Sequence, residues 1–374
     1  MRLRILVLPG DGIGPEVTAQ AVRVLGAVGQ RFGHTIDCAD APIGGAAIHL
    51  TGSPLPEGTR RLALEADATL LGAVGRPEFD GAPPERRPER GLLALRAAMG
   101  VYANLRPVRA RRGLAGASPL KPEIIDGTDL VVVRELTAGL YYGLPRGISG
   151  EGPETRAIDT MTYTRAEIER VARVAFKLAR RRRRRVTSVD KANVLENSRL
   201  WRRVVCEVAQ EFPDVTLTHL FVDNCAMQLI LNPTQFDVLL TENMFGDILS
   251  DEAAVLAGSI GLLPSASLGD PRPSGLCAGL YEPVHGSAPD LAGRNVANPL
   301  GAIESIAAMF DYGFGLTEEA AAIDAAIEAV IACGTLTADL KRDGPPASTT
   351  DVGDAVVAAL ATGRPPAVAQ PAAG

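Results

Sequence analysis

Aromatic residues, long hydrophobic runs and paired cysteines are scarce or missing in this sequence. Phe, Trp and Tyr make up 4% of the 374 residues, so the core must consist mainly of Ala, Val, Leu and Ile. No stretch approaches the roughly 18 apolar residues that a membrane-spanning helix needs. The apolar residues 5–8 are too few for a signal-peptide core. We therefore expect a cytoplasmic protein without a membrane partner.

The cysteines and histidines show no metal or disulfide pattern. The five cysteines are far apart and include no C-x-x-C pair, which predicts neither a disulfide framework nor a zinc site. The four histidines lack H-x-x-x-H spacing, and only His285, in EPVHGSAPD, is placed as a candidate ligand. With 38 Lys and Arg against 44 Asp and Glu, the net charge of −6 gives no general reason to expect a polyanionic partner.

Short apolar stretches alternate with amphipathic helices along the chain. Residues 163–180 carry apolar side chains at helical spacing, and another helix is expected to start near Phe245. Five stretches predict strands: residues 3–8, 66–74, 129–135, 186–189 and 237–240. This alternation favours an α/β protein with a mostly parallel sheet. The length suggests about two domains.

A glycine-rich turn and an arginine run need separate interpretations. Residues 10–15, GDGIGP, follow a strand and precede a helix, but their G-x-G-x-G spacing is not the Rossmann G-x-G-x-x-G. We interpret them as a tight turn, and contact with a phosphate or ribose stays open. The six arginines at 180–185 look like a nucleic-acid patch, but they follow a helix whose C-terminus favours cations. We expect a solvated helix end and no nucleic-acid partner.

Three arginines lie where an exposed arginine is unexpected. Arg96 follows GLLAL, Arg106 lies in YANLRPV, and Arg134 follows the strand LVVV directly. Converging guanidinium groups would suit a small substrate with more than one carboxylate. For each alone, a structural ion pair is the alternative, and Glu135 is a candidate partner for Arg134.

FGDILSDE places Asp247 and Asp251 on one face of a helix. A bound cation would explain two like charges at this spacing, and oxygen ligands suit Mg²⁺ or Mn²⁺. Asp223, in FVDNCAM, is a candidate third carboxylate. The alternative is a helix N-terminus enriched in acidic residues because of its dipole.

Lys191 and Tyr141 are candidates for proton transfer. Lys191, in SVDKANVLE, emerges from a strand end, where a desolvated lysine can lose its proton and act as a base. A structural salt bridge is the alternative for this lysine. Tyr141, seven residues beyond Arg134, is a possible proton donor.

Seven motifs occur in order across Leu8 to Gly293: LPGDGIGPEV, ANLRP, VREL, SVDKANVLE, FGDILSDE, GLLPSASLG and EPVHGSAPDLAG. Together they resemble the metal-dependent β-decarboxylating dehydrogenases of the isocitrate/isopropylmalate dehydrogenase family. The resemblance covers nearly the whole chain and implies oxidative decarboxylation of a 2-hydroxy dicarboxylic acid.

The resemblance implies an α/β fold of two domains that share a mixed sheet, which is not a Rossmann fold. The first, cofactor-side domain would comprise residues 1–101 and 258–362. The second, for dimerisation and for metal and substrate binding, would comprise residues 102–257, leaving a flexible tail at 363–374. Members are homodimers, so Lys191 and Asp223 would reach into the partner's site.

The resemblance also assigns roles to the candidate residues. The implied roles are carboxylate binding by Arg96, Arg106 and Arg134, binding of Mg²⁺ or Mn²⁺ and of substrate by Asp223, metal binding by Asp247 and Asp251, and proton transfer by Lys191 and Tyr141. The cofactor would lie along Ile13, Glu282, His285, Gly286, Ser287, Ala288, Pro289, Asp290 and Asn298. NADP-using relatives carry a lysine at the position of Asp290, and a carboxylate repels a 2′-phosphate, so NAD is expected.

Substrate choice rests on Glu89, Leu92 and Leu93, where isocitrate-using relatives carry Ser and Asn. Leucines offer no partner to a third carboxylate, whose unpaired burial would cost on the order of several kcal/mol. An isopropyl group would instead gain roughly 1.5–3 kcal/mol from apolar burial. We expect (2R,3S)-3-isopropylmalate to be converted to 2-oxo-4-methylpentanoate in leucine biosynthesis. D-malate, tartrate or another 3-alkylmalate is the alternative.

Two departures from the family pattern are visible. Residues 75–80, GRPEFD, replace a GGPKWD-like loop, and Glu242 stands where several relatives carry a small residue. Both are expected near the cofactor or the metal, and neither removes a proposed catalytic group.

Overall fold

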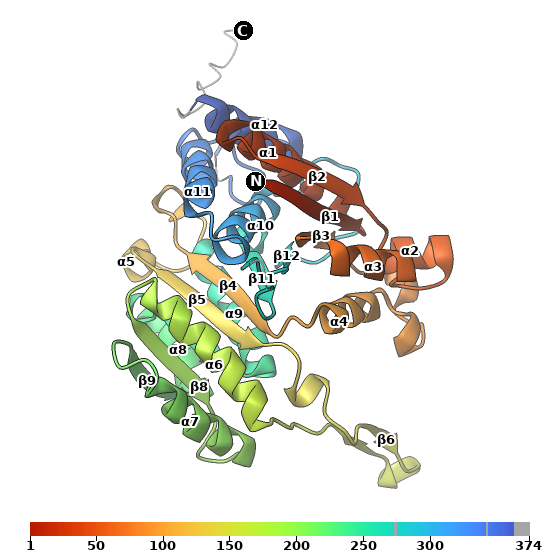
Figure 1. Ribbon diagram of the computed structural model, residues 1–374, viewed down its shortest axis with the longest axis vertical. Helices are drawn as coiled ribbons and strands as arrows, with labels where there is room; N and C mark the ends of the chain where they lie inside the picture. The colour runs from red at the N-terminus through yellow and green to blue at the C-terminus, as the bar shows by residue number, and fades with distance from the viewer. Residues whose placement is uncertain (273–274, 342, 363–374) are drawn as a thin grey trace. The chain divides into compact units, whose positions relative to one another are not determined.

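The computed structural model describes residues 1–272, 275–341 and 343–362, which form two compact units (Figure 1). Unit 1 comprises Met1–Gly100, Arg111–Pro119 and the chain from Ala257 onward; unit 2 comprises Val101–Ala110 and Leu120–Leu256. The tail expected at residues 363–374 lies outside the described residues. Among the helices described, none is both long and apolar enough to cross a membrane.

Unit 1 has a mixed sheet with the strand order β2-β1-β3-β12-β11. β1 (Arg2–Gly10) runs parallel to β2 (Thr35–Asp40) and β3 (Ala68–Ala73), and β12 (Leu280–Pro283) runs parallel to β3 and antiparallel to β11 (Pro264–Leu268). The helices of unit 1 are α1 (Gly14–Phe32), α2 (Gly44–Thr51), α3 (Glu57–Glu65), α4 (Pro88–Met99), α10 (Leu300–Ala308), α11 (Thr317–Ala332) and α12 (Thr349–Thr362). α1 packs against α10 and α12, and its buried residues include Val17, Ala21, Val24 and Leu25 (Figure 1).

In unit 2 the strands of the mixed sheet follow the order β4-β5-β10-β8-β9. β4 (Ala103–Arg109) is antiparallel to β5 (Asp129–Glu135), whereas β10 (Val238–Thr241), β8 (Arg185–Asp190) and β9 (Thr216–Phe221) continue the sheet in parallel. Its helices are α5 (Pro122–Ile125), α6 (Arg165–Arg180), α7 (Glu196–Ala209), α8 (Val222–Leu231) and α9 (Asn243–Ala257). In Figure 1, α6 and α7 cover the near face of this sheet and α8 lies behind it.

A two-stranded arm interrupts unit 2 between β5 and α6. Its strands, β6 (Gly147–Ser149) and β7 (Arg156–Ile158), pair with each other and with no strand of the main sheet. All six residues of the two strands are exposed to solvent. The arm therefore lacks a core of its own within the described residues.

The expected α/β class is confirmed, and the chain divides into two compact units. The strand expected at residues 129–135 is found with those bounds, and α9 begins at Asn243, two residues before the expected Phe245. α6 begins at Arg165 because Thr164 and Glu167 form a capping box at its N-terminus. Val131, Val132 and their neighbours are fully buried, as a continuous apolar strand in a parallel sheet requires.

The segment Arg111–Pro119 belongs to unit 1, although the expected second domain spanned residues 102–257 without a break. Arg111 is almost fully buried there and forms ion pairs with Glu304, Asp324 and Glu328 of α10 and α11. Gly113 leaves room for Ile331, whose Cγ2 atom would lie 2.6 Å from a Cβ at position 113. These contacts join partners about 200 residues apart in sequence, so helical or strand periodicity could not reveal them.

The arginine run after α6 is held by ion pairs rather than being merely solvated. Arg180 pairs with Asp214, and Arg182 pairs with Asp129 and Asp237. Arg183 donates to the backbone carbonyl group of Phe236. The expectation of a solvated helix end is therefore wrong for Arg182, whose side chain is only 15% exposed.

Candidate active site

The carboxyl edge of the unit 2 sheet collects most of the predicted catalytic residues. β5, β10, β8 and β9 are parallel, so their carboxyl ends lie along one edge, which is where open α/β sheets bind ligands. Arg134 lies at the end of β5, and Lys191 and Asp223 follow β8 and β9 directly. Asp247 lies in the second turn of α9, which follows β10. The sheet topology thus places one residue at or after the end of each of four parallel strands, all along the same edge.

Asp247 is the centre of a cluster of charged and hydrogen-bonding groups. Its Oδ1 atom accepts from Arg134 Nη1 and lies 3.4 Å from Arg106 Nη2. Its Oδ2 atom accepts a hydrogen bond from the Tyr141 hydroxyl at 2.8 Å. Burial raises the pKa of Tyr141, and this hydrogen bond adds to the rise. The structure therefore brings together the predicted Arg106, Arg134, Tyr141 and Asp247.

Arg134 is held in one orientation by Asn243. The Asn243 Oδ1 atom accepts from Arg134 Nε at 3.0 Å and from Arg134 Nη2 at 2.8 Å. The Asn243 amide group donates to the carbonyl oxygen of Ala138 at 3.0 Å. Glu135, the partner considered for Arg134 from sequence, instead accepts from Thr137 and Ala138 and lies 3.5 Å from Arg170. Sequence analysis did not identify Asn243 as a site residue, because a single asparagine forms no recognisable motif.

The two aspartates of α9 are bridged by a protein cation. Arg106 Nη1 lies 3.2 Å from Asp251 Oδ1, and the same guanidinium group contacts Asp247. Arg106 Nη1 also donates to Ser250 Oγ at 2.6 Å. Within the described residues, no three His, Cys, Asp or Glu side chains gather as a metal-ligand set. The metal site formed with a third carboxylate from a partner subunit stays a prediction.

Lys191 and Asp223 form an ion pair at the ends of β8 and β9. Lys191 Nζ lies 2.9 Å from Asp223 Oδ2, and the hydrogen bond lowers the pKa of Asp223. Asp223 is 65% exposed and Lys191 26% exposed as side chains, so both remain open to a further partner. The salt bridge considered as the alternative for Lys191 is present, and it does not bury the amine.

In unit 1, α4 carries the residues expected to select the substrate. Glu89, Leu92, Leu93 and Arg96 recur at a spacing of three or four residues and so lie along one side of the helix. Leu92 packs against the core cluster that includes Leu6, whereas Leu93 is not part of that cluster. Arg96 pairs with Glu282, which was expected to contact the cofactor. Arg96 Nε is buried, and no described residue offers it a hydrogen bond.

The loop expected to bind the cofactor packs against the first glycine turn. The Ile13 amide donates to the carbonyl oxygen of Ser287 at 2.8 Å. A Cβ atom at Gly12 would lie 1.9 Å from that oxygen, so this approach requires glycine at position 12. Gly286, Ala288, Pro289 and Asp290 follow or flank this contact, and Asp290 is exposed.

His285 and Asn298 differ in how their polar atoms are satisfied. His285 Nε2 is buried without a hydrogen-bond partner among the described residues, and burial lowers the pKa of this histidine. Asn298 is occupied within unit 1, since it donates to Asp339 and accepts from the amide of Leu300, both at 3.0 Å. His285 therefore has a nitrogen free for a ligand, whereas a cofactor contact by the Asn298 side chain would require these bonds to change.

Asp11, inside the glycine turn, was not singled out from sequence. It is fully buried and accepts from the amides of Gly45, Ala46 and Gly75 at 2.8–3.0 Å and from Arg76 Nε at 2.8 Å. Asp11 thereby fixes the GRPEFD loop to the turn and gives the arginine of that departure a structural partner. In the sequence, the position of Asp11 between two glycines was the one feature that could have drawn attention to it.

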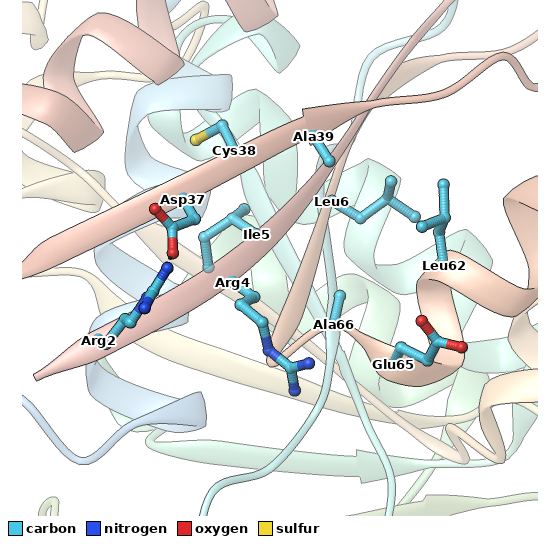
Figure 2. A pocket seen from close by; sticks show the side chains of 10 residues that line it. All are labelled: Arg2, Arg4, Ile5, Leu6, Asp37, Cys38, Ala39, Leu62, Glu65 and Ala66. Carbon is cyan, nitrogen blue, oxygen red and sulfur yellow. Dashed lines mark hydrogen bonds and ion pairs between the residues drawn. The ribbon is translucent and has the colours of Figure 1, made fainter.

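A cavity of about 380 Å³ lies elsewhere in unit 1, along β1, β2 and α3 (Figure 2). Its wall includes Ile5, Leu6 and Leu62, with Arg4 and Glu65 at the side. None of the predicted site residues lines it. The cavity therefore does not bear on the predicted chemistry.

Comparison with known proteins gives consistent matches along the chain. The sequence profile of the isocitrate/isopropylmalate dehydrogenase family matches residues 4–356. A 3-isopropylmalate dehydrogenase of Halalkalibacterium halodurans is 58% identical over 96% of this chain and 98% of its own, and one of Geobacillus kaustophilus is 60% identical over 91% of each. The crystal structure of isocitrate dehydrogenase from Methylococcus capsulatus superposes with a TM-score of 0.84 at 36% identity, covering 96% of this chain and 100% of that one.

Proposed function

The chain belongs to the isocitrate/isopropylmalate dehydrogenase family, and on this basis we propose that it oxidatively decarboxylates (2R,3S)-3-isopropylmalate. The products would be 2-oxo-4-methylpentanoate, CO₂ and reduced NAD. The observation that carries the proposal is the high identity, along nearly the whole chain, to relatives named for this reaction. Transamination of the product yields leucine, which places the reaction in leucine biosynthesis.

The apolar residues on α4 support a substrate with an alkyl branch. Leu92 and Leu93 precede Arg96, and neither side chain has a polar atom to pair with a third carboxylate. Arg96, Arg106 and Arg134 would bind the substrate's two carboxylates. Each has a guanidinium group with five donors, which matches carboxylate geometry.

Lys191 and Tyr141 would carry the protons. Lys191 would remove the proton of the 2-hydroxyl group through water as the hydride leaves C2, and loss of the β-carboxylate then requires a proton at C3. Tyr141 would donate that proton, because a tyrosine phenol is protonated at neutral pH, and burial raises its pKa further. Asp247 accepts the Tyr141 hydrogen bond and would hold the phenol in place.

The residues of α9 fit a hard divalent cation. Asp247 and Asp251 offer carboxylate oxygens one helical turn apart, and Asp251 is 60% exposed, so an ion has access to it. Together with Asp223 of the partner subunit they would hold Mg²⁺ or Mn²⁺. When bound, the ion would supply Lewis-acid stabilisation of negative charge, and NAD would accept the hydride.

The cofactor loop fits NAD rather than NADP. His285 Nε2 is buried and has no hydrogen-bond partner in the described part of the chain, so it has a nitrogen to offer to a base edge of the adenosine. The exposed carboxylate of Asp290 can accept hydrogen bonds from ribose hydroxyl groups and would repel a 2′-phosphate. These two residues support the expected cofactor.

Exposed apolar side chains support a homodimer formed through unit 2. Met227 and Leu231 of α8 and Ile248 of α9 are each more than half exposed, and Ile148 in the arm is 78% exposed. Large apolar side chains left exposed in this way are candidates for burial against a partner. A second copy of this chain would bury them and bring Lys191 and Asp223 to the partner's site.

A substrate panel tests the proposal directly. The purified protein is assayed with Mn²⁺ and NAD or NADP against 3-isopropylmalate, D-malate, tartrate and isocitrate. We expect the highest kcat/KM with 3-isopropylmalate, a lower KM for NAD than for NADP, and loss of turnover after EDTA dialysis that Mn²⁺ restores. A higher kcat/KM with D-malate or tartrate would replace the substrate assignment, and a lower KM for NADP would replace the cofactor.

A further inference from the structure

We propose that Glu242 and Tyr163 are positioning residues for Arg134, acting through Asn243 at the start of α9. The inference rests on the proposed function, in which Arg134 binds a substrate carboxylate. Each residue fixes the short segment from which Asn243 holds the guanidinium group.

Glu242 caps the helix that carries the aspartates. It is 4% exposed, and its carboxylate accepts from the amides of Met244 at 3.0 Å and Phe245 at 2.6 Å. An acidic group here satisfies amides that have no partner inside the helix and complements the helix dipole. The start of α9, and with it the placement of Asn243, is thereby fixed.

Tyr163 links the carboxylate to the backbone of Asn243. Its hydroxyl donates to Glu242 Oε2 at 3.2 Å and accepts from the Asn243 amide at 2.9 Å. The Tyr163 ring packs edge-on against buried Trp201 at a centroid distance of 5.5 Å. The hydroxyl therefore has little freedom to move, and it holds the Asn243 backbone while the side chain of Asn243 holds Arg134.

The packing around Arg134 leaves little room for another arrangement. A Cβ atom at Gly246 would lie 2.7 Å from Arg134 Cγ, so the first turn of α9 is fitted to the arginine stem. Arg134 Nη1 contacts Asp247, which also accepts from Tyr141. A shift of the α9 N-terminus would therefore move the carboxylate-binding arginine relative to the proton donor.

The nature of residue 242 decides how well this cap works. A small residue would leave the Tyr163 hydroxyl and two buried amides without their acceptor. Glutamine keeps one acceptor oxygen but turns an NH₂ group toward donors, so it removes part of the network without changing the side-chain volume much. Burial raises the pKa of Glu242, while the hydrogen bonds from the Phe245 and Met244 amides oppose the rise.

The test compares Glu242→Gln and Tyr163→Phe with Glu167→Gln as a matched control. Glu167 also caps a helix by accepting from the Thr164 amide, but that helix is α6, which carries neither Arg134 nor Asn243. In the full-length enzyme with Mn²⁺ and NAD, we expect both network variants to raise the KM for 3-isopropylmalate about tenfold or more. The KM for NAD should change less than about twofold, and the control should alter neither constant.

Melting temperatures and circular dichroism identify variants that fail to fold, and Glu242→Asp provides the conservative rescue. We expect the aspartate variant to recover part of the lost substrate affinity. A lower melting temperature with unchanged substrate KM, or equal losses toward substrate and NAD, would overturn the positioning role. If the wild-type enzyme prefers another 2-hydroxy dicarboxylate, its KM is used instead. If it turns over none, the proposed function and this inference are both rejected.

Discussion

Two neighbouring leucines on α4 have different surroundings, and this separates their expected roles. Leu92 packs against the core of unit 1, whereas Leu93 lies outside that core cluster. We expect Leu93→Ala to lower kcat/KM for 3-isopropylmalate about 5- to 30-fold, because the isopropyl group loses apolar contact worth roughly 1–2 kcal/mol. D-malate has no alkyl branch, so its kcat/KM should stay within about twofold.

Leu92→Ala provides the comparison for this assignment. Its partial burial in the core predicts a loss of about 1–2 kcal/mol in the free energy of unfolding. Steady-state kinetics with both substrates and urea unfolding of both variants separate the two effects. Equal losses of turnover on the two substrates in Leu93→Ala would remove Leu93 from the substrate pocket.

We expect His219 on β9 to make the free energy of unfolding depend on pH. Burial lowers its pKa, the nearby Arg202 lowers it further, and Asp190 opposes this. Below about pH 6.5, the unfolded chain therefore takes up a proton that the folded protein resists. The contribution of His219 to stability is present above that pH and is lost as the pH falls toward the lowered pKa.

Urea unfolding at about pH 7.5 and about pH 5.5, for wild type and His219→Gln, measures this contribution. Other titrating groups are common to both proteins, so the difference between their pH responses belongs to His219. We expect the wild type to lose more stability on acidification than the variant. The same loss in both proteins would show that this histidine keeps its ordinary pKa.

At the scale of elements, Arg111 anchors a chain segment to two helices. Its side chain is 4% exposed and pairs with Glu304, Asp324 and Glu328, which keep 17–48% exposure. We expect Arg111→Gln to lower the free energy of unfolding by about 2–3 kcal/mol, less than for a fully buried pair because solvent screens the carboxylates.

Arg60→Gln is the control for this effect. This substitution also breaks an ion pair with a carboxylate, that of Glu57, but the pair lies at the surface of α3. We expect no measurable change in its urea midpoint. Equal midpoints for the Arg111 and Arg60 variants would mean that the segment Arg111–Pro119 is held by packing alone.

Elements were predictable from sequence where a local pattern determines them. The strand Asp129–Glu135 contains an uninterrupted apolar run and was predicted with its exact bounds. α6 carries a clear apolar face and begins two residues later than predicted. The order of strands β5, β10, β8 and β9 could not be predicted in this way, because periodicity does not reveal which strands become neighbours.

The partners of charged residues were the part that local patterns could not supply. Arg182 was read as solvated because its partners, Asp129 and Asp237, are more than 50 residues away. Glu242 had no explanation from sequence because it binds backbone amides and Tyr163. The site residues were predicted from family motifs, whereas their hydrogen-bond partners became known only from the structure.

At the scale of the whole molecule, the proposed dimer makes each active site depend on two chains. Asp247 and Asp251 would come from one protomer, and Lys191 and Asp223 from its partner. The pair Lys191–Asp223 forms within one chain here and stays partly exposed, which leaves it accessible to a second copy. The activity of one single-site variant cannot reveal which chain supplies each of these residues.

We expect Lys191→Met and Asp247→Asn to be inactive when each is prepared alone. Mixing them and allowing subunits to exchange should restore activity, because a mixed dimer contains one site with an intact Asp247 from one chain and an intact Lys191 from the other. Random exchange makes half of the dimers mixed, with one working site in two, so the recovered rate should approach about a quarter of wild type.

Different affinity tags on the two variants allow mixed dimers to be isolated and counted before the assay. Their activity per mixed dimer should then approach about half that of the wild-type dimer, because one of the two sites carries both substitutions. Isolated mixed dimers without activity would place Lys191 and Asp247 of one chain in the same site. Tagged chains that never co-purify would instead contradict the dimer, and the exposed side chains of α8, α9 and the arm would then need another partner.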